Sequence, residues 1–198
     1  GARIEEVKVP TLHVATIANA VIYYNAFWDA HKSDAASVLK NGAPQRRALL
    51  RSRGLDHRVV DLHYREHDLP GHTPQELVRA HAVAKARDVD ARSGVPDRGA
   101  ILAADTAVVI DDRVLGKPAD RAEAQAMLDR LSGRTHTVIT GVCLRWAGGE
   151  VVAADQTDVT FRPIGAAQMG WYLDRGEWHG RAGGYAIQGS GAALVQAV

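Results

Sequence analysis

Residues 99–118 constrain the fold of this chain more than any other part of its sequence. Residues 100–104 form a short apolar run typical of a buried strand, and Asp105 stands at its end. The apolar pattern resumes over 106–110, and two aspartates then predict a tight turn that leads back toward Lys117. We therefore expect a buried strand and a hairpin that bring a carboxylate and a lysine to the same crevice.

Two interpretations of this pair stay open on these residues alone. In the first, Asp105 is a general base or a metal ligand, and Lys117 neutralises a bound phosphate. In the second, Asp105 caps a turn and Lys117 is a solvated surface residue. The pattern favours neither interpretation over the other.

The balance of charges limits the kinds of partner. The 198 residues include 24 Lys and Arg against 23 Asp and Glu, which gives a formal net charge of +1. Such a balance argues against a nucleic acid polymer or an anionic membrane surface as partner, whereas a small anionic ligand needs only a few cations. The length suits one large domain or one domain with an appendage. No apolar run is long enough to span a bilayer.

The single cysteine, Cys143, excludes an internal disulfide framework and favours a reducing, cytoplasmic setting. It lies in an apolar strand pattern. We therefore expect a buried structural thiol rather than a nucleophile.

Residues 1–35 differ from the rest of the chain. Apolar side chains from Ile17 to Trp28 recur at helical spacing, as in a docking helix or the remnant of a neighbouring domain. We expect an N-terminal extension over 1–35 and one domain over 36–198.

A strong helix start lies in the first half of that domain. Thr73 has the preferred chemistry for an N-cap, a proline follows it, and Glu76 completes a capping box. The helix is expected to end near residue 92. Lys85 lies in its middle, where a lysine is usually solvated but is a phosphate contact if the helix lines a cleft. The side chains expected to face inward are Leu77, His81, Ala84 and Val89.

Other elements are expected along the whole domain. They are strands at 37–39 and 57–62, helices at 45–53, 120–131 and 165–175, a hairpin of 135–146 with 150–162, and a last strand at 192–198. The glycine-rich residues 180–191 predict a tight strand that brings Gln188 close to a ligand. Arg46 lies at the start of the first helix, where it binds a phosphate or is solvated, and the residues alone favour solvation.

Four histidines lie close together in sequence around Glu66, at positions 57, 63, 67 and 72. Their spacing matches no zinc pattern, and no cysteine pair completes one. Glu66 suits a hard cation such as Mg²⁺, which takes one or two carboxylates together with substrate oxygens.

Taken in order, several short motifs resemble the Maf family of nucleotide pyrophosphatases, which are related in fold to the inosine triphosphatases. The resemblance covers about 38–198. The motifs are Gly42-Ala43-Pro44-Gln45-Arg46-Arg47, Ala84-Lys85-Ala86, Ala104-Asp105-Thr106, Leu115-Gly116-Lys117-Pro118, Leu131-Ser132-Gly133-Arg134-Thr135-His136 and Arg181-Ala182-Gly183-Gly184-Tyr185-Ala186-Ile187-Gln188-Gly189. It implies an α/β fold in which a twisted mixed sheet is flanked by helices, with a cleft between two lobes. The family's last helix is absent, so it also implies a domain truncated at its C-terminus.

The resemblance further implies metal-dependent hydrolysis of a nucleoside triphosphate to a monophosphate and pyrophosphate. The catalytic residues are expected to be Asp105, Glu66, Lys85 and Lys117, with Glu66 and Asp105 also holding Mg²⁺ or Mn²⁺. The expected substrate-binding residues are Arg46, Gln45, Thr106 and Gln188. Thr106 and Gln188 are similar to the branch that acts on dTTP and UTP.

The alternative is a nucleotide-binding regulator of cell division and septum formation with little or no turnover. Ala43 favours this alternative, because the family usually has a serine at that place. Both functions imply a cytoplasmic protein whose partner is a nucleoside triphosphate, and the oligomeric state is left open, with a homodimer among the alternatives.

Overall fold

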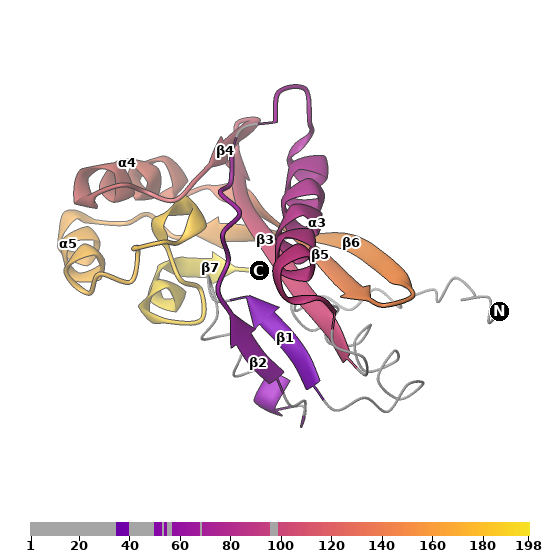
Figure 1. Cartoon of the computed structure of the whole chain (residues 1–198). Coiled ribbons are helices and arrows are strands. Elements are labelled where there is room, and N and C mark those ends of the chain that lie inside the picture. The colour runs from indigo at the N-terminus through magenta and orange to yellow at the C-terminus, as the bar shows by residue number, and fades with distance from the viewer. Residues whose placement is uncertain (1–34, 40–49, 53, 55–56, 68, 96–98) are drawn as a thin grey trace.

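The computed structural model describes residues 35–39, 50–52, 54, 57–67, 69–95 and 99–198 (Figure 1). The elements are β1 (Ala35–Leu39), β2 (His57–Val60), α3 (Pro74–Ser93), β3 (Gly99–Ile110), β4 (Arg113–Leu115), α4 (Arg121–Leu131), β5 (Thr135–Trp146), β6 (Gly149–Phe161), α5 (Ala166–Asp174), the 3₁₀ helices η1 (Ala182–Gly184) and η2 (Ser190–Leu194), and β7 (Val195–Ala197). The helix expected within 1–35 and most of the helix expected at 45–53 lie outside the described residues; residues 50–52 are helical.

The described strands form one mixed sheet in the order β2-β1-β3-β5-β6-β7, with β4 also paired to β3. β1 runs parallel to both β2 and β3. The other neighbours in this order pair antiparallel, namely β3 with β5, β5 with β6, and β6 with β7. The expected long hairpin is confirmed, because β5 and β6 pair over their whole length. A mixed sheet flanked by helices is the expected fold class.

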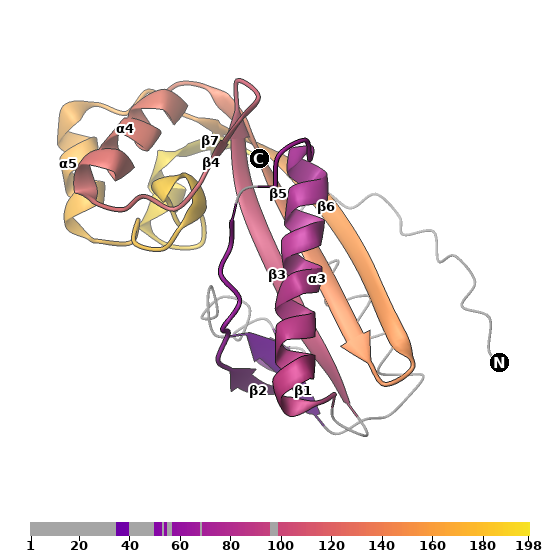
Figure 2. The ribbon, with the colours of Figure 1, turned by 45° about the horizontal axis from the view of Figure 1, so that its top comes forward.

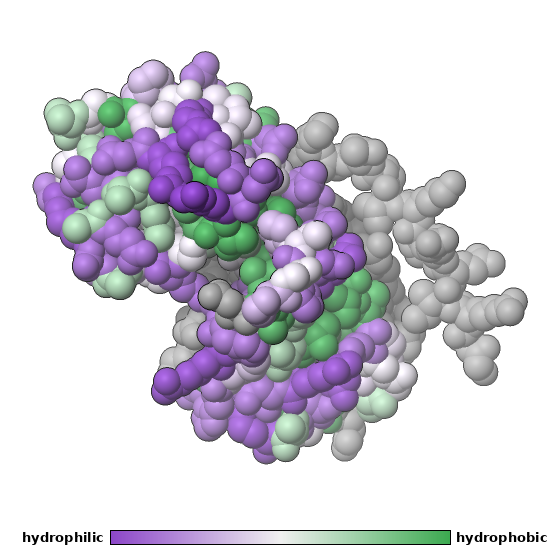
Figure 3. All heavy atoms as spheres, turned by 90° about the horizontal axis from the view of Figure 1, so that it is seen from above, coloured by the Kyte–Doolittle hydropathy of each residue, from purple (hydrophilic) through white to green (hydrophobic). Residues whose placement is uncertain are grey.

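Two lobes share the strands β3 and β5 (Figure 2). In one lobe α3 covers the first half of β3, where Ile101 and Ala103 pack against buried alanines of the helix. In the other lobe α4, α5 and the 3₁₀ helices surround the second half, where Val108 and Ile110 join a larger core. Asp105 therefore lies where the two lobes meet. From above, the surface is notched between them (Figure 3).

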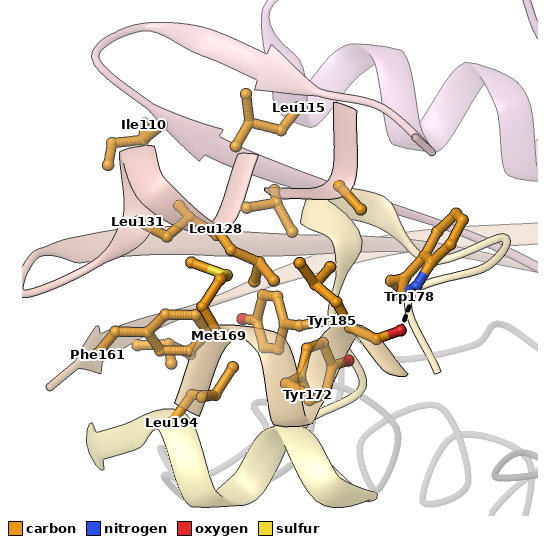
Figure 4. Packing of buried hydrophobic residues seen from close by; sticks show 14 residues of the cluster. Ile110, Leu115, Leu128, Leu131, Phe161, Met169, Tyr172, Trp178, Tyr185 and Leu194 are labelled. Carbon is orange, nitrogen blue, oxygen red and sulfur yellow. Dashed lines mark hydrogen bonds between the residues drawn. The ribbon is translucent and has the colours of Figure 1, made fainter. Parts of the chain in front are cut away.

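The core of the second lobe holds the two largest fully buried side chains of the described residues, Tyr172 and Phe161. Leu128 and Leu131 of α4 face Met169 and Tyr172 of α5, with Phe161 beneath them (Figure 4). Fully burying a side chain of this size contributes about 1.5–3 kcal/mol. Packing of apolar surface is therefore what holds α4 and α5 on the sheet.

The single cysteine lies in the core of the first lobe. Cys143 is fully buried in β5, and burial raises the pKa of its thiol to about 12. The thiol is therefore protonated at neutral pH, and the expectation of a buried structural thiol is confirmed.

The prediction of a strand at 180–191 is wrong, and the last strand is shorter than the predicted 192–198. The chain forms η1, a turn and then η2, which takes the place of the first part of the strand expected at 192–198. Gly183 and Gly184 have φ angles of +67° and +71°, which a strand excludes. A Cβ on Gly183 would come within 3.0 Å of Val108, so this glycine lets the chain turn tightly against β3.

α3 is the longest of the described helices, but its exposed face is strongly charged. Among the described residues, no helix combines the length and the apolar composition that a membrane crossing requires.

Candidate active site

Four charged side chains from four separate segments meet at the junction of the two lobes. The ammonium Nζ of Lys85, in α3, is 2.5 Å from Oδ1 of Asp105 and 2.6 Å from Oε1 of Glu66. The other oxygen of Glu66 accepts a 2.7 Å hydrogen bond from Nζ of Lys117. The two carboxylates and two ammonium groups thus form one continuous chain of contacts.

The sequence pattern predicted that Asp105 stands at the end of a strand, and this prediction is wrong. β3 continues through it without a break to Ile110. The reason is that both polar side chains here are paired: Lys85 compensates the buried carboxylate, and Oγ1 of Thr106 lies 2.9 Å from Oγ1 of Thr140 in β5. Neither side chain needs water, so the strand does not have to end.

Beside Asp105, one edge of β3 has no strand paired to it among the described residues, and we call this stretch the open edge. β1 pairs with 99–102 and β4 pairs with 108–110, and within the part of the chain that is described no strand pairs with 103–107 on that edge. Successive side chains of a strand point to opposite faces, so Asp105 faces α3 and Thr106 faces the other side. The two side chains therefore lie on opposite faces of the sheet beside the unpaired stretch of β3.

α3 lies unusually close to β5 at the level of the site. Gly141 of β5 is the register partner of Asp105, and a Cβ on it would come within 2.4 Å of the backbone oxygen of Val78. Only glycine therefore permits this approach of the helix backbone. The close approach places Lys85 over β3, where its ammonium reaches Asp105.

The inward face of α3 differs from the expected one. The capping box of Thr73 and Glu76, and the burial of His81 and Val89, are confirmed. Leu77 and Ala84 are only half-buried, however, and the face also contains Val78, Ala82, Lys85 and Ala86. Lys85 is 4% exposed, so the interpretation as a solvated residue is wrong.

The segment between β2 and α3 is fastened along α3. Its hydrogen bonds join the backbone oxygen of Asp61 to Arg92 (2.6 Å), the backbone nitrogen of His63 to Asp88 (3.0 Å), and the hydroxyl of Tyr64 to Nδ1 of His81 (2.8 Å). These bonds fix the course of the chain up to Glu66. They therefore place its carboxylate within reach of Lys85.

The loop after β4 presents Lys117 from the other lobe. Leu115 and Pro118 on either side of it are buried, while Lys117 itself is exposed. The backbone oxygen of Gly116 accepts a 3.0 Å hydrogen bond from the backbone nitrogen of Gly183. The loop is thus attached to η1, and the lysine side chain extends from it to Glu66.

The charges of the site keep Glu66 ionised. Burial raises the pKa of Glu66, but hydrogen bonds from Lys117 and Lys85 outweigh burial and lower it to about 2. Burial lowers the pKa of His81 against the opposing effect of the two carboxylates, so its imidazole is neutral at pH 7. Burial, Asp105 and Glu66 together raise the pKa of Tyr64, which keeps its hydroxyl protonated.

The remaining expected site residues are Gln188, Gln45 and Arg46. Gln188 is exposed in the turn between η1 and η2, and among the described residues it has no hydrogen bond to the four charged side chains. Gln45 and Arg46 lie outside the described residues. The sequence interpretation missed Tyr64 and His81; each precedes a charged site residue closely, but spacing alone does not show that they touch.

The donor set is compatible with a divalent metal. One oxygen of Glu66 and one of Asp105 lie within 2.6 Å of the same ammonium group, so both carboxylates point at one cation position. Hard oxygen donors of this kind suit Mg²⁺ and Mn²⁺. The described residues contain no group of three or more His, Cys, Asp or Glu able to hold a metal ion. Among the described residues, a metal ion at this position would therefore have only these two carboxylates as ligands.

Residues 38–198 match the family described as Maf-like protein. A dTTP/UTP pyrophosphatase of Symbiobacterium thermophilum is 46% identical over 162 residues, which cover 81% of each chain. The dTTP/UTP pyrophosphatase of Anaeromyxobacter dehalogenans is 44% identical over 165 residues, again 81% of each chain. Among solved structures, a nucleoside-triphosphatase / dITP/XTP pyrophosphatase from Mycobacterium abscessus has 17% identity and a TM-score of 0.41, covering 66% of this chain and 76% of that chain.

Proposed function

Because this chain belongs to the Maf-like protein family, we propose that it hydrolyses nucleoside triphosphates, dTTP and UTP foremost, to a monophosphate and pyrophosphate. Its relatives at 46% and 44% identity carry the name of that activity. The observation that carries the proposal is the meeting of Asp105, Lys85, Glu66 and Lys117 beside the open edge of β3. Cleavage of a phosphoanhydride needs a group that activates water next to cations that neutralise the departing pyrophosphate.

Asp105 takes the proton of the attacking water in this proposal. Its carboxylate accepts a hydrogen bond from the ammonium of Lys85, and no described strand pairs with the edge of β3 beside it. Lys85 and Lys117 donate to phosphate oxygens. A bound triphosphate competes with the carboxylates for the two ammonium groups, so its arrival frees Asp105 to accept a proton.

Glu66 and Asp105 also hold Mg²⁺ or Mn²⁺ in this proposal. When bound, the metal supplies charge neutralisation and lowers the pKa of coordinated water. Glu66 is already ionised, because its lysine partners lower its pKa to about 2. It therefore exchanges ammonium partners for a metal ion without having to lose a proton.

Gln188 and Thr106 are proposed to govern the choice of base, with Gln45 as a third position. The amide of Gln188 both donates and accepts hydrogen bonds, as the edge of a pyrimidine requires. Thr106 lies at the open edge of β3, on the face opposite Asp105. Arg46 is proposed to bind the triphosphate, as the family resemblance implies.

Release of pyrophosphate from dTTP, UTP, CTP and 7-methyl-GTP, with and without Mn²⁺, tests the proposal. We expect metal-dependent turnover that is fastest with dTTP and UTP. Faster turnover of 7-methyl-GTP would overturn the substrate assignment. Tight nucleotide binding without metal-dependent pyrophosphate release would leave only a regulator of the kind considered from the sequence.

Asp105→Asn is expected to reduce turnover by at least about a hundredfold, because the positioned base is lost. Asp112→Asn is the matched control, since Asp112 is an exposed aspartate in the turn after the same strand. A rate near that of the unchanged protein for Asp105→Asn would remove Asp105 from the mechanism.

The proposed setting is the cytoplasm, with free nucleotides rather than a nucleic acid polymer or a membrane as partner. The near-balance of charges and the single cysteine support this. The oligomeric state stays open between a monomer and a homodimer, which light scattering after size-exclusion chromatography distinguishes.

A further inference from the structure

We propose that Glu177 is a positioning residue for substrate choice, whose carboxylate fixes the turn 187–189 so that Gln188 meets the nucleobase in one orientation. This inference rests on the proposed function and extends it to a residue that touches neither the phosphates nor the base. Its basis is the way in which the segment 183–190 is held.

Glu177 binds the far end of the turn with both of its oxygens. Oε2 accepts a 2.7 Å hydrogen bond from the backbone nitrogen of Ser190, and Oε1 accepts one of 2.8 Å from the Ser190 hydroxyl. A Cβ on Gly189 would come within 2.4 Å of Oε2 of Glu177. The carboxylate thus lies directly against the backbone of the residue that follows Gln188.

Hydrogen bonding by Ser190 lowers the pKa of Glu177, so the carboxylate is ionised and accepts both bonds at neutral pH.

The near end of the turn is fixed by the core of the second lobe. The hydroxyl of Tyr172, which is fully buried, accepts a 3.0 Å hydrogen bond from the backbone nitrogen of Ala186. The hydroxyl of Tyr185 lies 2.7 Å from Nε2 of the buried His136. A further 3.0 Å bond, from the nitrogen of Gly189 to the oxygen of Ala186, closes the turn on itself.

Residues 187–189 are exposed, but hydrogen bonds hold the chain on both sides of them, at Ala186 and at Ser190. The same segment also touches the phosphate side of the site, because the nitrogen of Gly183 binds the oxygen of Gly116, next to Lys117. Base and phosphate contacts thus share one hydrogen-bonded frame. A specificity residue on such a frame loses little freedom on binding, which sharpens its choice between similar ligands. Glu177 is the part of this frame that lies outside the apolar core.

A double-mutant cycle tests whether Glu177 acts through Gln188. The variants are Glu177→Ala, Gln188→Ala and the pair, and kcat and KM are measured separately with dTTP and with CTP. We expect Glu177→Ala to reduce the preference for dTTP over CTP by about three- to tenfold, through KM, with kcat for dTTP changed by less than about twofold. In the Gln188→Ala background the same substitution is expected to leave the preference unchanged, because the residue it positions is gone.

Asp174→Ala is the matched control. Asp174 is an exposed carboxylate in the same lobe, paired with Arg121 at 2.7 Å and remote from the turn in its contacts. We expect it to leave the preference for dTTP unchanged. Glu177→Gln keeps the shape and one acceptor oxygen, so it is expected to retain part of the preference; it carries the test if Glu177→Ala does not fold.

Three results would overturn the positioning role: an equal loss of kcat with every nucleotide, an unchanged preference in Glu177→Ala, or effects of Glu177→Ala and Gln188→Ala that simply add. In each of these cases the unchanged protein still releases pyrophosphate, so the proposed function survives. Absence of pyrophosphate release from the unchanged protein would instead overturn the proposed function. In that case the cycle is repeated with the Kd values of dTTP and CTP. A preference for dTTP that falls in Glu177→Ala, but not in the Gln188→Ala background, would support the positioning role. An unchanged preference or simply additive effects would overturn it.

Discussion

The helices of the two lobes differ in the kind of contact that they make with the sheet. Where α3 meets β3, the ammonium of the buried Lys85 contacts both the buried Asp105 and Glu66. Around α4 and α5, by contrast, leucines and aromatic rings fill the core, and Trp178 donates its N–H to a backbone oxygen of α5 (Figure 4). Buried ion pairs are seldom more stabilising than apolar residues of the same volume. The charges at the junction of the lobes are therefore better explained by chemistry than by stability.

The comparison also separates what each lobe contributes to the site. The first lobe supplies Lys85, Glu66 and the face of β3 that carries Asp105, whereas the second supplies Lys117 and the turn with Gln188. A change in the first lobe is expected to alter the chemical step. A change in the core of the second lobe is expected to alter folding stability first.

The largest effect is expected for Lys85→Met. This change keeps the length of the side chain but leaves Asp105 as a buried carboxylate without its partner, which costs about 3 kcal/mol of folding stability. Turnover of dTTP should fall by at least about a hundredfold, because an ammonium that neutralises the triphosphate is also lost. Urea denaturation and pyrophosphate release measure the two effects. Unchanged turnover would show that the buried pair is structural only.

Leu128→Ala is the counterpart in the apolar lobe. Leu128 is fully buried between α4 and the sheet, so the substitution should lower the free energy of unfolding by about 2–5 kcal/mol. In the protein that remains folded, kcat and KM should change by less than about twofold, because no site contact is touched. A loss of kcat as large as that of Lys85→Met would contradict the division between the lobes.

A fall in pH should destabilise the apolar lobe through His136. Burial lowers the pKa of His136 to about 4, below its ordinary value of 6.5, and the residue is 2% exposed. The unfolded chain therefore binds this proton more readily than the folded one, so stability is complete above pH 6.5 and is lost as the pH falls toward 4. The loss amounts to about 3 kcal/mol.

Urea denaturation between pH 7 and pH 4 measures this loss, with His136→Gln as the control. Glutamine has no proton to gain over this range, so the part of the pH dependence that comes from His136 should disappear. An identical pH dependence in both proteins would show that other groups are responsible.

The smallest effect is expected for Gly141→Ala, at the place where β5 packs against the backbone of α3. The added methyl group meets the backbone of α3 at Val78, so the helix has to move outward at a cost of about 1–3 kcal/mol. Because Lys85 moves with the helix, kcat should fall by about tenfold while KM changes little. Gly170→Ala is the control, since a Cβ on this helical glycine meets no atom within 4 Å.

Much of the fold was predictable because it depends on interactions between residues that are close in sequence. The capping box before α3 and the tight connection of the β5–β6 hairpin each have a local physical cause. The 3₁₀ helices between 182 and 194 were not predictable in this way. Their glycines were visible in the sequence, but the turn is set by contacts with elements distant in the chain, since Gly183 lies against Val108 of β3 and Gly184 against Ala124 of α4.

The site was predictable only as a set of residue types. Short motifs marked Asp105, Glu66, Lys85 and Lys117, but their surroundings left Lys85 open between solvation and a phosphate contact and predicted Asp105 at the end of a strand. The structure buries Lys85 beside an Asp105 that lies within an unbroken strand, because each residue supplies the charge that makes burial of the other possible.

The sequence by itself determined the α/β class, the long hairpin, the caps of the helices and the family to which the chain belongs. Only the tertiary structure decided that Asp105 lies within an unbroken strand beside an open edge, that Lys85 is buried, and that Glu66 and Lys117 complete the chain of charges. The reason is physical: secondary structure follows from contacts between residues close in sequence, whereas a buried charge is stable only when folding brings its partner from a distant segment.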